Sequence, residues 1–350
     1  MAEIVILGAG VMGSAFSQLL ADVRHKVCLV GTYLDREWIE SIRANGFHPK
    51  LGVKLHNAIV PFTYDQLGDA LGDNTDVIVL GVSSAGVDWA VAQLGPLLKG
   101  PTPIIMLTKG LAASDSTLQI LPDMVQESLA GYGFKDIQVG AIGGPCIAGE
   151  LAVRRESSVV IAHPDEALLD YLLDLLAAPY YHARPSADII GVEVCAALKN
   201  FYALAVSHPT GQLEICTKAE NDARMYNPSA GLFTQALAEM EQIVAYMGGN
   251  SATVYGLAGA GDLYVTCQAG RNSRMGRLLG TGLRYGEAKS KHMPEDTVEG
   301  ADLALTIGPT LGRLIEEEGL NQSALPLTLS IIDAICRNKP LQIPWDKFYW

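Results

Sequence analysis

Two lysines occupy positions at which a proton could be moved. Lys109 follows an apolar run in "MLTKGL", and Lys199 lies with Asn200 inside the strongly apolar stretch "AALKNFYAL". A lysine that loses water in such surroundings can act as a proton donor or acceptor. Lys199 could instead extend its charged end to solvent along its apolar stem. The residues alone leave both interpretations of Lys199 open.

A second pattern near the start of the chain could bind a dinucleotide. Three glycines spell G-x-G-x-x-G after the apolar run 3–7 and before a helical pattern. In that context the first glycine permits a tight turn, the second lets a pyrophosphate approach the backbone, and the third lets helix and strand pack closely. An ordinary glycine-rich turn is the alternative. The expected cofactor contacts are Gly8, Gly10, Val11, Met12 and Gly13.

The end of the second apolar run bears on which dinucleotide would bind. NAD-specific sites usually carry Asp or Glu about 20 residues after the glycines. Here the run ends in "VGTY", the nearest acid is Asp35, and Arg36 follows it. A strand end without a carboxylate does not repel a 2′-phosphate, which Thr32 or Arg36 could contact. Arg36 could equally be a solvated residue at a helix start, so both NAD and NADP remain open.

Two further glycine-rich stretches have no obvious single role. "GGPCIAGE", residues 143–150, is either a loop that offers backbone N–H groups to a ligand or a plain turn. Residues 256–280 carry six glycines, one acid, Asp262, and the pair Arg271 and Asn272. This stretch is too apolar for a linker. It is not a second nucleotide loop, because Tyr264 stands at the third glycine position.

The pattern of apolar runs indicates which helices and strands hold the candidate residues in the first half of the chain. Apolar runs at 3–7, 26–31, 76–82, 102–108 and 158–163 alternate with helical patterns such as 86–98 and 116–130. Continuous apolar strands interleaved with helices are typical of a parallel sheet buried on both faces. The sequence therefore predicts an α/β fold whose N-terminal domain, residues 1–186, is a Rossmann-type doubly wound parallel sheet.

The rest of the chain, residues 187–350, is predicted to form a mainly α-helical domain. Apolar residues recur at helical spacing over 189–208, 229–248 and 301–319. The polar segment 210–229, which includes Lys218 and Pro228, is predicted to be a long surface connection.

Composition excludes several classes of function. Apolar residues make up 49% of the 350 residues and the net charge is −13, so a large core is expected and nucleic acid is an unsuitable partner. A phosphorylated ligand would need a local positive site. The six cysteines show no C-x-x-C pair and suggest buried thiols in a reducing, cytoplasmic compartment. The histidines have no metal-ligand spacing, and we expect neither a metal, a signal peptide nor a membrane span.

Taken together, the motifs resemble the NAD(P)-dependent sn-glycerol-3-phosphate dehydrogenase family. The order is G-A-G-x-x-G, "TKGL", "GGPCIAGE", "GVEVCAALKN", "GLAGAGDLYVTC" and "GRNSRMGRLLG", spread over roughly residues 4–335. The resemblance implies hydride transfer between NAD or NADP and C2 of sn-glycerol 3-phosphate or dihydroxyacetone phosphate. It also suggests a homodimer.

The resemblance also implies roles for individual residues. Lys199 matches the proton acceptor, Asp262 the carboxylate that holds it, and Lys109 a second lysine near the reacting oxygen and the cofactor. "GAGD" would be a close-packed turn that presents Asp262 to Lys199, and "GRN" the start of a phosphate-binding helix. The other implied substrate contacts are Gly144, Cys146, Asn200, Thr266, Arg271 and Asn272. The other implied cofactor contacts are Thr32, Ala148, Arg271, Thr297 and Glu299.

Four positions depart from the family pattern. Cys146 replaces Ser or Thr, Ser229 replaces a basic residue, Thr234 stands near a usual arginine, and Gly270 replaces a frequent Ser. A different phosphorylated polyol or ketose phosphate is therefore an alternative substrate. A non-catalytic nucleotide sensor is an alternative of another class, although both Lys199 and Asp262 are present.

Overall fold

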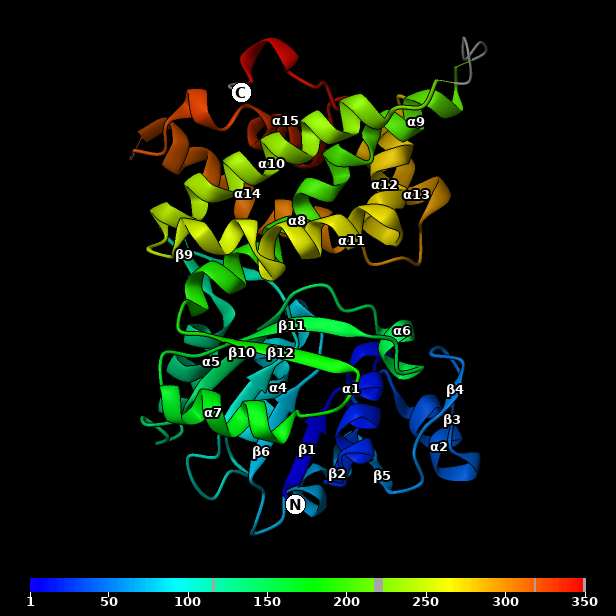
Figure 1. Ribbon diagram of the computed structural model, residues 1–350, viewed down its shortest axis with the longest axis vertical. Coiled ribbons are helices and arrows are strands. Elements are labelled where there is room, and N and C mark those ends of the chain that lie inside the picture. Colours follow the sequence, from blue (N-terminus) through cyan, green and yellow to red (C-terminus); the bar gives the residue numbers. More distant parts are fainter. Residues whose placement is uncertain (115–116, 217–222, 318, 349–350) are drawn as a thin grey trace. The chain divides into compact units, whose positions relative to one another are not determined.

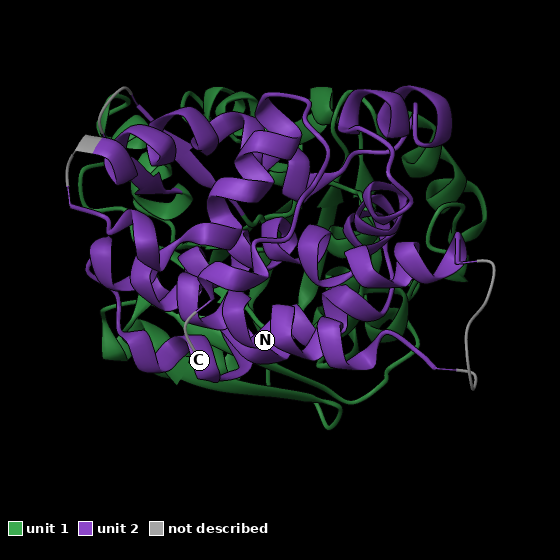
Figure 2. Ribbon diagram, turned by 90° about the horizontal axis from the view of Figure 1, so that it is seen from above, with its two compact units in different colours: residues 1–109, 121–189 green, residues 110–120, 190–350 purple. Residues whose placement is uncertain are grey.

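The computed structural model describes residues 1–114, 117–216, 223–317 and 319–348. The chain forms two compact units (Figure 2): Met1–Lys109 with Leu121–Ile189, and Gly110–Ile120 with Ile190–Trp350. The segment 110–120 thus belongs to the second unit, whereas the pattern of the sequence places a single boundary after residue 186.

The first unit contains an eight-stranded sheet in the order β12-β11-β10-β7-β6-β1-β2-β5 (Figure 1). Neighbouring strands are parallel except at β10–β11, so the sheet is mixed rather than wholly parallel. All five predicted strands are present, and β5, β10 and β12 were not predicted. The bounds are β1 Glu3–Leu7, β2 Lys26–Val30, β5 Ile59–Phe62, β6 Val77–Leu80, β7 Ile104–Met106, β10 Val139–Gly143, β11 Ser157–Ala162 and β12 Tyr181–Ser186.

Both faces of this sheet are covered, as a doubly wound fold requires. Alternation along β1 places Ile4 and Ile6 on one face and Val5 and Leu7 on the other. All four are at most 2% exposed. The helices of this unit are α1 Val11–Asp22, α2 Arg36–Asn45, α3 Leu67–Ala70, α4 Val87–Leu94, α5 Leu121–Ala130, α6 Ala148–Ala152 and α7 Glu166–Leu175, with a small hairpin of β3 Phe47–His48 and β4 Val53–Lys54.

One predicted helix is shorter than expected. The pattern 116–130 was assigned to helix, but β9 (Leu118–Ile120) pairs antiparallel with β8 (Leu111–Ala113), and α5 begins only at Leu121. Pro122 explains the difference, because a proline ring clashes with the carbonyl four residues earlier and so disfavours helix over the residues before it. Residue 116 lies outside the described residues.

The second unit is mainly helical, as predicted. The helices predicted at 189–208, 229–248 and 301–319 correspond to α8, α10 and α14, and residue 318 is not described. The bounds are α8 Ile189–Val206, α9 His208–Glu214, α10 Tyr226–Tyr246, α11 Asp262–Gln268, α12 Arg271–Gly280, α13 Tyr285–His292, α14 Glu299–Glu317 and α15 Pro326–Cys336.

The predicted connection 210–229 is partly helical. Helix α9 extends to Glu214 and α10 begins at Tyr226. Pro228 is compatible with α10 because it lies in the first turn, where its missing N–H would have no helical partner. Residues 217–222, including Lys218, lie outside the described residues.

Helix α8 is the core of the helical unit. Each residue from Gly191 to Val206 is buried. Among the described residues, one helical stretch, Ile189–Glu214, is long and apolar enough to cross a membrane, where the sequence led us to expect none; 89% of its most apolar window is buried inside the protein. A helical stretch buried to this extent belongs to the core of the helical unit.

The prediction that all six cysteines are buried is wrong. Cys195 is buried, Cys216 is exposed, and the other four are partly exposed. Cys216 lies two residues after the end of α9.

A buried carboxylate ties two helices of this unit together. Glu239 of α10 is 0% exposed and accepts hydrogen bonds from the backbone N–H groups of Leu327 (2.7 Å) and Thr328 (2.6 Å) in the first turn of α15. The Thr328 hydroxyl and the Gln235 amide also donate to it. Burial nevertheless raises the pKa of Glu239 to about 7.

We predict that Glu239 makes stability fall between about pH 4.5 and 7. In this window the folded protein holds a proton that the unfolded chain has lost, so raising the pH favours unfolding. A shift of this size corresponds to roughly 3 kcal/mol. As pH rises, the melting temperature of the wild type should fall relative to that of Glu239→Gln, because the amide does not titrate. Parallel curves would contradict the prediction.

Candidate active site

The three glycines of the first loop meet the demands of a dinucleotide turn. Gly8 has φ +117°, and a Cβ there would lie 2.6 Å from the carbonyl carbon of Gly81. A Cβ on Gly13 would lie 2.0 Å from the Gly8 oxygen, whereas Gly10, which precedes α1, has nothing within 4 Å of a Cβ position. The N-terminus of α1, with half-buried Val11 and Met12, is thus open to an anion.

The strand order identifies the edge at which a ligand would bind. Strands β5-β2-β1-β6-β7-β10 are consecutive and parallel, which is the 3-2-1-4-5-6 order of dinucleotide-binding folds. Ligands of such sheets bind at the carboxyl ends of the strands, where the order reverses, here between β1 and β6. Gly8 and Gly81 follow these two strands, and Thr32 follows β2.

Lys109 and the 143–150 loop lie on the same edge. Lys109 follows β7, and its Nζ lies 3.4 Å from the carbonyl oxygen of Gly144, which follows β10 with φ +111°. Cys146 is half-buried, and Ala148 is buried at the start of α6. The segment 143–150 therefore ends in a short helix rather than being a loop throughout.

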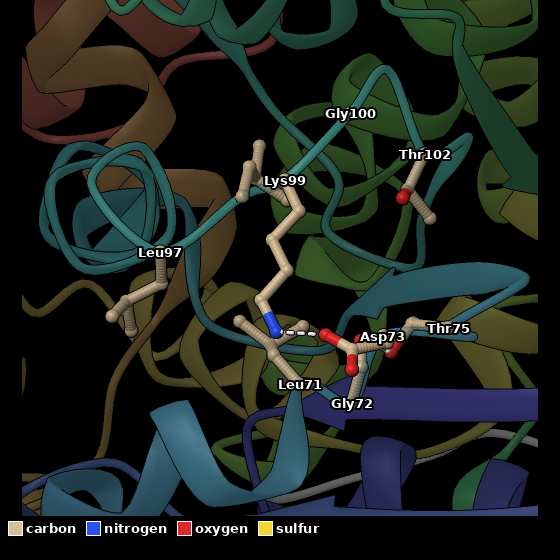
Figure 3. A pocket seen from close by; sticks show the side chains of 9 residues that line it. Leu71, Gly72, Asp73, Thr75, Leu97, Lys99, Gly100 and Thr102 are labelled. Carbon is tan, nitrogen blue, oxygen red and sulfur yellow. Dashed lines mark hydrogen bonds and ion pairs between the residues drawn. The ribbon is translucent and has the colours of Figure 1, made fainter.

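The opposite edge of the sheet carries a hollow of about 170 Å³ (Figure 3). Segments 71–75 and 97–102, which line it, precede β6 and β7. Lys99 forms an ion pair with Asp73 there, and both side chains are well exposed. The hollow contains no candidate residue, and an exposed pair of this kind contributes little to stability.

In the helical unit, Lys199 and Asp262 meet as predicted. Lys199 donates a hydrogen bond to the Asp262 carboxylate, and the side chains are 10% and 1% exposed. Lys199 therefore does not extend to solvent. The "GAGD" turn is a single π-helical turn, Leu257–Gly261, that leads directly into α11. A Cβ at Gly259 would lie 2.0 Å from the Val254 oxygen, so only glycine allows this close packing.

A network of amide side chains connects α8, α12 and α14. Asn272 donates to the Asn200 oxygen (2.9 Å), and Asn200 donates to Glu299 (3.1 Å). The Asn272 oxygen accepts from the backbone N–H of Gly300 (2.9 Å). A Cβ on Gly300 would lie 2.1 Å from the Asn200 carbonyl oxygen, so glycine is required where α14 begins.

Arg271 is the first residue of α12, as predicted. Its side chain is exposed, unlike those of Asn200 and Asn272. Gly270 before it has φ +107°, a conformation that serine would adopt only with strain. The Arg271 side chain is 44% exposed and lies 3.2 Å from the Glu299 carboxylate. Thr297, two residues before α14, is exposed, and the Thr266 hydroxyl donates to the Asp262 carbonyl (2.7 Å).

Cys267 lies close enough to Lys199 to feel its charge. Burial raises the pKa of Cys267 to about 12, although the Lys199 charge opposes the shift. The thiol is therefore uncharged at neutral pH and does not compete with Asp262 for the lysine.

The two remaining departures from the family pattern lie on α10. Thr234 is exposed and its hydroxyl donates to the Ala230 carbonyl (3.1 Å) of its own helix. Ser229 is half-buried in the first turn. Within the part of the chain that is described, no group of three or more His, Cys, Asp or Glu side chains is placed to hold a metal ion.

Comparison with known proteins identifies the family. Residues 3–169 match the model of the NAD-dependent glycerol-3-phosphate dehydrogenase N-terminus, and residues 188–344 match that of the C-terminus. The chain belongs to this family. It is 37% identical over 283 residues, 81% of each chain, to the NADP(+)-dependent glycerol-3-phosphate dehydrogenase of Archaeoglobus fulgidus.

Two further relatives cover almost the whole chain. Glycerol-3-phosphate dehydrogenase [NAD(P)+] of Geobacillus kaustophilus is 31% identical over 97% of this chain and 92% of its own. The crystal structure of glycerol-3-phosphate dehydrogenase from Coxiella burnetii has a TM-score of 0.79 at 26% identity, covering 97% of this chain and 96% of that one.

The sequence did not single out Gly300, which sets the distance between α8 and α14. Its only signal is the glycine after an acid in "TVEG". Nor did it single out His48, a buried side chain that contacts the dinucleotide loop. A lone histidine outside any motif gives no such signal.

We predict that Gly300→Ala lowers both stability and activity. The new methyl group cannot fit against the Asn200 carbonyl, so α14 must move and the Asn200–Glu299 contact must lengthen. Overpacking of this kind costs about 1–3 kcal/mol or more. Melting temperature and turnover report the effect.

Gly312→Ala in the same helix is the matched control. No atom lies within 4 Å of a Cβ there, so the alanine should leave activity unchanged and slightly raise stability. Equal behaviour of the two variants would contradict the prediction.

Proposed function

We propose that the protein interconverts sn-glycerol 3-phosphate and dihydroxyacetone phosphate with NAD or NADP as the redox partner. The observation that carries this proposal is the buried Lys199–Asp262 pair, connected by α8 to an Asn200–Asn272 contact beside Arg271. It combines a proton-transfer group with an anion-binding helix start, in a chain that belongs to this family.

The first unit fits a dinucleotide. Its G-x-G-x-x-G turn has the close approaches described above, and the N-terminus of α1 faces the position of a pyrophosphate in such folds. When bound, the nicotinamide would accept or supply the hydride at C2. We propose that Thr32, Lys109, Ala148, Thr297 and Glu299 also contact the cofactor, together with Arg271.

Lys199 is proposed to move the hydroxyl proton. In the oxidation, the C2–H bond breaks as hydride leaves, and the hydroxyl proton passes to the Lys199 amine as the C2–O bond becomes a carbonyl. In the reduction, the Lys199 ammonium returns that proton to the developing alkoxide. Lys109 would stabilise the same oxygen electrostatically.

Asp262 is proposed to hold Lys199 through both protonation states. A buried ammonium without a partner would be strongly disfavoured, and the carboxylate compensates for its loss of water. Asp262 directly follows the π-helical turn Leu257–Gly261, and its backbone N–H bonds to the Leu257 carbonyl, which fixes its position on the chain. The pair thereby keeps the nitrogen in one position.

The phosphate is proposed to bind at the start of α12. Arg271 supplies two or more N–H donors, Asn272 an amide, and the helix its unpaired backbone N–H groups. Gly144, Cys146, Asn200 and Thr266 would contact the rest of the substrate. Binding a remote phosphate aligns C2 and lowers the entropic cost of the reaction.

Two alternatives stay open to experiment. The departures at Cys146, Ser229, Thr234 and Gly270 favour testing longer ketose phosphates. A non-catalytic nucleotide sensor is disfavoured by the Lys199–Asp262 contact. We further propose that residues 1–186 serve the cofactor and 187–350 the substrate, and that the protein is a cytoplasmic homodimer of glycerophospholipid metabolism; these proposals follow from the family resemblance.

Initial rates of NADH and NADPH oxidation test the proposal. We expect oxidation with dihydroxyacetone phosphate and little with phosphate-free dihydroxyacetone. A panel of longer ketose phosphates serves as the comparison. Fast turnover of another ketose phosphate without turnover of dihydroxyacetone phosphate would replace the proposed substrate.

We predict that Lys199→Met lowers kcat by about a hundredfold or more, as loss of a general acid–base does. Cofactor affinity, measured by titration, should stay close to that of the wild type. Lys291→Met is the control, because Lys291 is exposed and pairs with Glu287 on α13. Wild-type turnover by Lys199→Met would remove this lysine from the mechanism.

We predict that Arg271→Gln raises KM for dihydroxyacetone phosphate by about tenfold or more, since a charge-assisted contact is worth over 1 kcal/mol. The slow rate with phosphate-free dihydroxyacetone should not change. Arg274→Gln, on the same helix and paired with Asp296, is the control. An equal loss with both ketones would show that Arg271 does not recognise the phosphate.

A further inference from the structure

We propose that Asp35 positions the dinucleotide loop rather than binding the cofactor ribose, so that its loss weakens NADH and NADPH equally. Asp35 is the first acid after β2, where an NAD-specific site would carry a ribose ligand. This inference rests on the proposed function, because it concerns the cofactor of that reaction.

The contacts of Asp35 show how its carboxylate is used. One oxygen, Oδ2, accepts from the backbone N–H of Thr32 (2.8 Å), from the Thr32 hydroxyl (2.9 Å) and from the backbone N–H of Ala9 (3.2 Å). Asp35 is 6% exposed. Ala9 lies between Gly8 and Gly10, so one buried carboxylate joins the glycine loop to the end of β2.

The backbone leaves room for this arrangement at Gly31. A Cβ on Gly31 would lie 2.7 Å from Ile39 and 3.2 Å from the Asp35 side chain. A larger residue at the end of β2 would therefore push α2, and Asp35 with it, away from the loop. Glycine at this position allows the carboxylate to turn inward.

His48 hydrogen-bonds the carbonyl of the same residue, Ala9. Its Nε2 lies 2.9 Å from the Ala9 carbonyl oxygen, and its Nδ1 lies 3.0 Å from the backbone N–H of Leu51. Because the Leu51 N–H can only donate, Nδ1 accepts, and the proton is on Nε2 and is donated to Ala9. His48 is 0% exposed and its ring lies 5.3 Å from that of Trp38.

Ala9 is thus held at both its N–H and its carbonyl. These two bonds restrict the rotation of the two peptides that flank Ala9, and the second of these leads into Gly10, the residue that precedes α1. A prealigned loop binds a pyrophosphate without first losing conformational freedom. The pyrophosphate is common to NAD and NADP, so this positioning does not distinguish them.

The same contacts argue against Asp35 as a ligand of the cofactor ribose. A ribose ligand must offer acceptor oxygens to two hydroxyls and repels a 2′-phosphate. Here three protein donors already converge on Oδ2 and reduce the negative charge felt at the strand end. Discrimination between the cofactors then falls to other groups.

The test is direct titration of the purified full-length protein with NADH and with NADPH, followed by fluorescence. Asp35→Ala should weaken both cofactors by the same factor, about tenfold, which corresponds to about 1.4 kcal/mol. Asp35→Asn keeps an acceptor oxygen and should recover most of the affinity. His48→Ala should resemble Asp35→Ala, and Glu37→Gln, an exposed acid in the first turn of the same helix, is the control.

Steady-state kinetics separate positioning from a general loss of structure. KM for each cofactor should rise with the binding constants, while kcat at saturating cofactor and KM for dihydroxyacetone phosphate stay close to the wild type. If Asp35→Ala does not fold, Asp35→Asn and His48→Ala carry the test, with melting temperature as the check.

Two outcomes would overturn the proposal. Weaker NADH with unchanged or tighter NADPH would make Asp35 a ribose ligand, and unchanged affinity for both would remove it from the site. Failure of the proposed function would give a different result, because the wild type would then bind the cofactors without reducing dihydroxyacetone phosphate. The titration would still decide the role of Asp35.

Discussion

The helical unit depends on placing an ammonium and a carboxylate together inside an apolar helix cluster. Removing Lys199 and Asp262 from water costs several kcal/mol per ion, and only close pairing with further donors compensates for it. The pair lies in a buried core, since every residue of α8 from Gly191 to Val206 is buried and Asp262 is 0% exposed. The π-helical turn at Leu257–Gly261 is the backbone that brings the acid within reach.

The amide network connects this pair to the start of α12, which is the proposed phosphate site. Asn200 neighbours Lys199 on α8 and uses both ends of its amide, one for Asn272 and one for Glu299. A buried polar group left without a partner costs about 1–3 kcal/mol, so these contacts fix the relation of α8, α12 and α14. Because Asn200 follows Lys199 on α8 and Asn272 follows Arg271 on α12, the Asn200–Asn272 bond fixes the backbone positions of Lys199 and Arg271 relative to each other.

Local signals in the sequence were enough to predict the Rossmann-type sheet and the helical second half, because glycines and apolar periods act within a few residues. The contact between Lys199 and Asp262 spans 63 residues and was predicted only through the family resemblance. The β8–β9 hairpin has no distinct local signal, because the apolar residues at 118 and 120 fit a helix as well as a strand. The roles of Asp35 and His48 could not be predicted, since both depend on contacts with Ala9 across 26 and 39 residues.

In a chain with net charge −13, the proposed phosphate site needs a local positive potential, which a helix N-terminus and Arg271 would supply together. Helices α1 and α12 are each preceded by a glycine, Gly10 and Gly270, and neither has a side-chain cap on its first N–H groups. A serine or aspartate cap would occupy those groups, as Asp165 does at the start of α7. At the proposed phosphate site, the uncapped start of α12 would leave its N–H groups to the phosphate, and Arg271 would add selectivity. A serine at position 270 would strain the backbone and would also offer a cap, so Gly270 is compatible with an open helix start.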